Sequence, residues 1–129
     1  FDLRSLTTLK GPLQSNHPQI KLGNGFDHNW CLDAYQPNMT QPALVAKAYD
    51  PESARTLAVY TTMAGIQLYT ANYIGPEPIG KGGTEYQGKH AYCFETQCYP
   101  DSPNHPQFPS ATLNANEDYY SVTEYQLSF

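Results

Sequence analysis

The chain has 129 residues, which is long enough for one domain with one hydrophobic core. Its formal charge of -5 comes without a basic cluster that could neutralise a row of phosphates, so we expect no nucleic-acid partner. The apolar stretches are strand-sized and fall short of the ~20 residues of a membrane helix, so we expect a soluble protein with no membrane partner. Three cysteines without a framework spacing favour a reducing, cytoplasmic setting.

The composition predicts an all-β protein. Tyrosine and proline are both abundant, and aromatic residues favour strands while proline favours the loops and edges between them. The chain opens at Phe1 within a strand-like run, without a signal-peptide pattern, so we expect a cut or processed end. Period-two alternation and β-forming residues predict five strands, at residues 43–49, 56–62, 66–72, 91–97 and 119–129.

The connections between these strands differ in kind. The turn Asp50-Pro51-Glu52-Ser53 predicts a hairpin that joins the first two strands. Residues 74–90 and 99–109 form long irregular stretches, which in a compact domain are usually functional or disordered. Gly80-Lys81-Gly82-Gly83 lacks the spacing and the following helix of a phosphate loop, so we interpret it as a hairpin tip or a lid.

Glu95 is the first candidate for chemistry, because it lies inside an apolar run where a carboxylate is rare unless it is paired or functional. Alternation places Cys93, Glu95 and Gln97 on one face of the strand and Phe94 on the other. If the Glu95 face is exposed to solvent, the residue is an ordinary surface carboxylate. If the face lines a cleft, Glu95 is a candidate general base.

A second candidate is the segment Gly25-Phe26-Asp27-His28-Asn29-Trp30, which combines a carboxylate, an amide and aromatic rings. Such a mixture suits a sugar, since polar groups fork onto hydroxyls while rings cover the apolar C–H faces. In the alternative reading, Asp27 caps a turn and Trp30 belongs to the core. For His105, hydrogen bonding within its proline-rich loop is the favoured interpretation over a catalytic role.

A zinc site is not expected, although Cys93, Cys98, His90 and His105 are of the ligand type. Cys93 and Cys98 are five residues apart and face opposite ways on a strand, and no Cys-x-x-Cys pair is present.

Several motifs resemble the C-terminal half of the aldose 1-epimerase family, and they occur in the family's order. They are Gly25-Phe26-Asp27-His28-Asn29, Tyr60-Thr61-Thr62, Gly65-Ile66-Gln67-Leu68-Tyr69-Thr70-Ala71-Asn72, Phe94-Glu95-Thr96-Gln97 and Tyr99-Pro100-Asp101-Ser102-Pro103-Asn104-His105-Pro106. The resemblance implies that residues 1–129 are the C-terminal segment of a single large, twisted, antiparallel β-sandwich of the galactose mutarotase-like type. It also implies interconversion of the α and β anomers of aldohexoses such as galactose and glucose.

The resemblance assigns roles to three residues. Glu95 removes the proton of the anomeric hydroxyl, Asp27 holds sugar hydroxyls and Gln67 lies in the pocket, and no metal or organic cofactor is needed. The family's acid is a histidine, assisted by a second histidine and an arginine, all upstream of the matched region. We therefore expect the N-terminal remainder of the same enzyme as a partner, and we expect Glu95, Asp27 and Gln67 to share one concave, aromatic-lined face.

Three alternatives stay open at this stage. A carbohydrate-binding domain without catalysis could use Asp27, Gln67 and Trp30 to hold a sugar. A glycoside hydrolase could use Asp27 and Glu95 as its carboxylate pair, with the separation of the carboxyl groups as the diagnostic. A sugar-phosphate epimerase of the same fold would need basic residues near the pocket, and this segment offers few.

Overall fold

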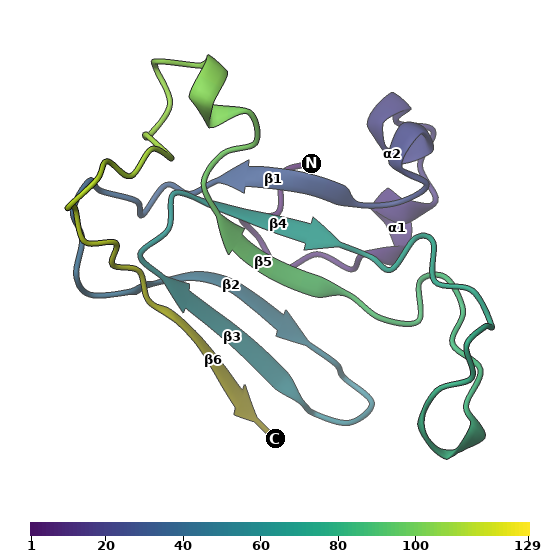
Figure 1. The fold of residues 1–129 in the computed structure, drawn as a ribbon. Coiled ribbons are helices and arrows are strands. Elements are labelled where there is room, and N and C mark those ends of the chain that lie inside the picture. Colours follow the sequence, from purple (N-terminus) through teal and green to yellow (C-terminus); the bar gives the residue numbers. More distant parts are fainter. The chain divides into compact units, whose positions relative to one another are not determined.

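The computed structural model describes all of residues 1–129, and the chain divides into two compact units. The first unit contains Phe1–His28 and Leu68–Cys93, and the second contains Asn29–Gln67 and Phe94–Phe129. Six strands dominate the structure, with only short helices between them (Figure 1). In chain order the elements are α1 (Lys10–Leu13), α2 (Pro18–Gly23), β1 (Asp27–Cys31), β2 (Ala43–Tyr49), β3 (Thr56–Thr61), β4 (Gly65–Tyr69), η1 (Lys81–Gly83), β5 (Cys93–Gln97), η2 (Ser102–Asn104) and β6 (Thr123–Ser128).

The strands form two three-stranded sheets, one in the order β1-β4-β5 and one in the order β2-β3-β6. This arrangement confirms the all-β prediction. None of the helices is long and apolar enough to cross a lipid bilayer.

The β2-β3-β6 sheet lies entirely in the second unit, and β3 occupies its centre (Figure 1). Both pairings are antiparallel, with Tyr49 opposite Thr56 at the hairpin end. The predicted turn is present, and the Asp50 carboxylate stabilises it by accepting hydrogen bonds from the backbone N–H groups of Glu52 and Ser53 at 3.3 and 3.2 Å. A short polar side chain that bonds the backbone just ahead of it is the reason why aspartate favours the first position of such turns.

Contacts between β5 and β6 show which side of β5 faces β6 within the second unit. The hydroxyls of Thr96 and Thr123 are 2.6 Å apart, and the Tyr125 hydroxyl donates to the Phe94 carbonyl at 2.7 Å. Because successive side chains of a strand point to opposite faces, the side chains of Glu95 and Gln97 lie on the face of β5 that is turned away from Thr123.

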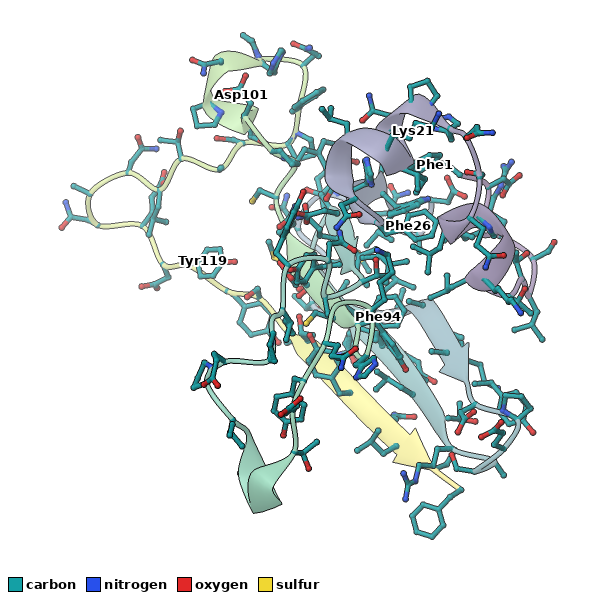
Figure 2. All side chains as sticks on the ribbon, turned by 90° about the vertical axis from the view of Figure 1, so that its right-hand side faces the viewer. Phe1, Lys21, Phe26, Phe94, Asp101 and Tyr119 are labelled. Atoms are coloured by element: carbon teal, nitrogen blue, oxygen red, sulfur yellow. The ribbon has the colours of Figure 1, made fainter.

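The first unit has a core centred on Phe26, whose side chain is fully buried. Ile20 of α2 and Leu68 of β4 are buried with it. The Phe1 ring packs edge-on against Phe26, with ring centroids 5.5 Å apart, and Figure 2 shows both rings near the helix that carries Lys21.

Four of the five predicted strands are shifted or shortened by a few residues, while β2 has the predicted bounds. The strand β1 was not predicted, because Asp27-His28-Asn29-Trp30-Cys31 lacks an apolar alternation and contains residues that are depleted in strands. Its place beside β4 in the sheet supplies the extended conformation that its composition does not favour. The helix α2 has six residues, too few to show a helical stripe.

Candidate active site

Glu95 occupies the middle of β5, and its side chain is exposed. Its carboxylate makes no hydrogen bond or ion pair with the rest of the chain. Because the Glu95 side chain is exposed, the partial burial that a carboxylate in a cleft would show is not observed. The carboxylate is accessible to a ligand that approaches this face of the sheet.

Three carboxamides meet on the same face, and we call Asn29, Gln67 and Gln97 the amide cluster. The Gln97 Nε2 group donates to Asn29 Oδ1 and to Gln67 Oε1, both at 3.2 Å. These residues come from β1, β4 and β5, so three strands of one sheet each contribute one amide. Since Gln97 is two residues after Glu95 on the strand, the structure brings Glu95 and Gln67 to one face of the sheet within the second unit.

Gly65 makes room for this cluster. A Cβ atom added at Gly65 would collide with the carboxamide of Asn29. Because Gly65 has no side chain, the Asn29 amide can lie over β4 at this position, within hydrogen-bonding distance of Gln97.

Asn29 and Gln97 were not among the predicted site residues. The signal for Gln97 was present in the sequence, since it alternates with Glu95 on one face of a predicted strand. The signal for Asn29 was its place in the Phe26-Asp27-His28-Asn29 motif, but only the pairing of β1 in the sheet brings it to the other two amides.

Trp30 and Phe94 alternate with cluster residues along β1 and β5, so both rings belong to the opposite face from Asn29 and Gln97. Trp30 is half-buried and does not belong to the fully buried core. Partial burial, together with the neighbouring Cys31 thiol and the Tyr35 hydroxyl, raises the pKa of Tyr99.

Asp27 lies in the first unit at the start of β1, with an exposed side chain. The backbone before it is tightly specified. The helix α2 ends at Gly23, its C-cap residue Asn24 is in the left-handed conformation with φ 51°, and Gly25 follows with φ 140°. Gly25 must be glycine, because an added Cβ would meet the side chains of Asn72 and Thr70.

Asn72 and Thr70 hold the segment that leads into Asp27. The Asn72 Nδ2 group donates to the carbonyls of Gly23 and Phe26 at 2.9 and 2.8 Å. The Thr70 hydroxyl accepts from the Phe26 N–H at 3.0 Å and donates to Asn72 Oδ1 at 2.7 Å. Both side chains are buried. This clamp, Thr70 and Asn72, explains why buried polar residues follow β4, and it holds the segment that leads into Asp27 within the first unit.

His28 follows Asp27 and packs edge-on against the rings of Phe1 and Phe26. Burial lowers the pKa of His28, the neighbouring Asp27 carboxylate opposes this effect, and His17 adds to it. His28 therefore favours its neutral form in the folded chain.

The polar residues of the loop after β5 contact other residues of the same loop. The Ser102 hydroxyl is buried and donates to the Tyr99 carbonyl at 2.6 Å. His105 lies 3.1 Å from the Asp101 carboxylate and stacks on the ring of Phe108. Figure 2 labels Asp101, which directly precedes the short helix η2 of this loop. These contacts agree with the interpretation of His105 as a loop residue rather than a catalytic one.

No group of three or more His, Cys, Asp or Glu side chains is arranged to hold a metal ion. The three cysteines are free thiols. A hollow in the first unit is lined by Leu9, Leu13, Thr70, Lys89, His90, Ala91 and Tyr92, and it includes none of the predicted site residues. The predicted grouping of Asp27 with Glu95 and Gln67 on one concave face stays a prediction.

Comparison with known proteins identifies relatives of the whole chain. The model of the aldose 1-epimerase family matches residues 1–126. Galactose mutarotases from Bos taurus and Homo sapiens are each 38% identical over 128 residues. The aldose 1-epimerase of Escherichia coli strain K12 is 32% identical over 128 residues. The matches cover 98–99% of this chain but only 35–36% of these relatives, so the chain spans about a third of their length.

Proposed function

The chain belongs to the aldose 1-epimerase family, and we propose that the protein to which it contributes interconverts the α and β anomers of aldohexoses such as galactose and glucose. The observation that carries this proposal is the position of Glu95, an accessible carboxylate on the same sheet face as the amide cluster. Ring opening of a sugar hemiacetal requires a base that removes the C1 hydroxyl proton, and hydrogen-bonding amides on the same face are suited to hold other hydroxyls of the sugar.

In the proposed mechanism, the Glu95 carboxylate accepts the proton of the C1 hydroxyl. An acid protonates the ring oxygen, the bond between C1 and the ring oxygen breaks, and an aldehyde forms. Rotation about the bond between C1 and C2 then exposes the other face of the aldehyde, and the ring closes as the two protons return. The step is a proton relay, with no electrons gained or lost.

Gln67 and Asp27 are proposed to hold sugar hydroxyls. A carboxylate such as Asp27 accepts two hydrogen bonds in a fork, while a carboxamide such as Gln67 donates and accepts. These contacts fix the orientation of the ring, so that the C1 hydroxyl meets Glu95.

The acid is proposed to come from the polypeptide that precedes this region in the longer relatives, since this chain spans 35% of their length. This N-terminal remainder is the proposed partner of the chain. We also propose that the protein is located in the cytoplasm. Within the second unit the one histidine, His105, is paired with Asp101 and stacked on Phe108, which supports an acid from elsewhere.

Polarimetry of freshly dissolved α-D-galactose or α-D-glucose tests the proposal. We expect the chain joined to the N-terminal part of a relative to accelerate the decay of optical rotation, and the 129-residue chain alone to give little rate above the spontaneous one. If the joined protein binds galactose but never exceeds the spontaneous rate, the non-catalytic carbohydrate-binding alternative replaces the enzyme.

A further inference from the structure

We propose that Gln97 is a positioning residue that orients the Gln67 carboxamide, so that Gln67 meets a sugar hydroxyl as a hydrogen-bond donor. The inference deepens the proposed function and rests on it, because the sugar site is the one proposed above. It assigns a role to a residue that does not itself need to touch the substrate.

The amide nitrogen of Gln97 carries two hydrogens. A carboxamide has two N–H donors at one end and an acceptor oxygen at the other. The two contacts of the Gln97 Nε2 group, at 3.2 Å to Asn29 Oδ1 and 3.2 Å to Gln67 Oε1, account for both of its donors. The oxygen of Gln67 is thereby engaged by Gln97, and the other end of the Gln67 carboxamide can act only as a donor.

The surroundings of the amide cluster hold this arrangement in place. Asn29, Gln67 and Gln97 are all half-buried, so a carboxamide that loses its partner is only partly compensated by water. Asn29 lies over Gly65, where no side chain displaces it. The second N–H of Gln97 therefore has Asn29 Oδ1 as its acceptor, and the pairing of β1 with β4 holds Asn29 in place.

The resulting polarity suits a sugar hydroxyl. A hydroxyl has one proton to donate and two lone pairs to accept with. A face that offers N–H donors from Gln67 and a carboxylate from Glu95 satisfies both functions at once. Reversal of the Gln67 carboxamide would turn its oxygen toward the sugar, on a face that already carries the Glu95 carboxylate, and would remove the Gln67 donor for the hydroxyl lone pairs.

Replacement of Gln97 by methionine is the first test, since methionine keeps a similar length but offers no N–H donor. In the chain joined to the N-terminal part of a relative, we expect Gln97→Met to raise KM for galactose by on the order of tenfold with kcat changed by less than about twofold, because Gln67 acts in the ground and transition states alike. The control is Gln126→Met on the exposed β6, for which both constants should stay unchanged. An unchanged KM in Gln97→Met would overturn the inference.

Nuclear magnetic resonance of the side-chain amides tests the hydrogen bond independently of activity. In the 129-residue chain, Gln97→Met should shift the Gln67 amide signals without any sugar present, and Gln126→Met should not. Gly65→Ala should shift the Asn29 amide signals, and Gly11→Ala, where an added Cβ meets nothing, should leave them in place. If the Gln67 amide signals do not shift in Gln97→Met, the positioning role is overturned. If the joined wild-type protein neither binds nor converts galactose, the proposed function is overturned instead.

Discussion

Phe94 and Glu95 are adjacent in the sequence, but their side chains lie on opposite faces of β5. The strand β6 approaches the Phe94 side, through the Tyr125 hydroxyl and through the pair Thr96 and Thr123. Glu95 is left on the face that carries Gln97, which in turn binds Gln67. At the scale of single residues, the alternation of side chains along β5 thus places the packing side chains on one face and Glu95 on the other.

His28 provides a prediction on pH at the same scale. Burial lowers its pKa below the ordinary value of 6.5, so below that pH the unfolded chain binds a proton more readily than the folded chain does. The free energy of unfolding should therefore decrease as the pH falls from 7 to 5, and His28→Gln should remove part of this decrease. Urea unfolding at a series of pH values measures the effect.

The control for this experiment is His90→Gln, because the His90 side chain is exposed. A wild-type chain and a His28→Gln chain whose stabilities change in parallel over that pH range would contradict the role of His28.

At the scale of elements, the sequence was most informative where local chemistry decides the structure. The hairpin of β2 and β3 was predictable, because Asp50 specifies its turn and both strands alternate. The strand β1 was not, because its extended form depends on β4 rather than on its own residues. For the same reason Asn29 was not predicted as a site residue, because it lies on β1. Glu95 and Gln67 lie on strands that the alternation of side chains predicted.

Asn72, in the segment that follows β4, holds a part of the chain that is distant in sequence. Asn72→Ala removes two donors to the carbonyls of Gly23 and Phe26 and the acceptor of the Thr70 hydroxyl. Because these groups are buried, we expect the free energy of unfolding to fall by about 2–3 kcal/mol. Urea denaturation measures this loss, and Gln41→Ala in an exposed bend is the control. A loss below about 0.5 kcal/mol would show that water replaces the clamp.

At the scale of the whole molecule, the proposed function has the chain supply the base and the amides that bind the sugar, while the chain spans about a third of the length of its relatives. The family motifs are spread over both units, with Asp27 in the first and Glu95 and Gln67 in the second. A complete proton relay needs an acid in addition to Glu95. We therefore predict that activity depends on polypeptide beyond these 129 residues.

The most direct measurement is the turnover of α-D-galactose by Glu95→Gln in the chain joined to the N-terminal part of a relative, followed by polarimetry. Glutamine keeps the size of glutamate but cannot accept the C1 proton, so kcat should fall by roughly 10²–10⁴-fold while KM changes little. Asp27→Asn should instead impair kcat and KM together, and Glu124→Gln on the exposed β6 should leave both unchanged. A Glu95→Gln protein with the wild-type kcat would contradict the account.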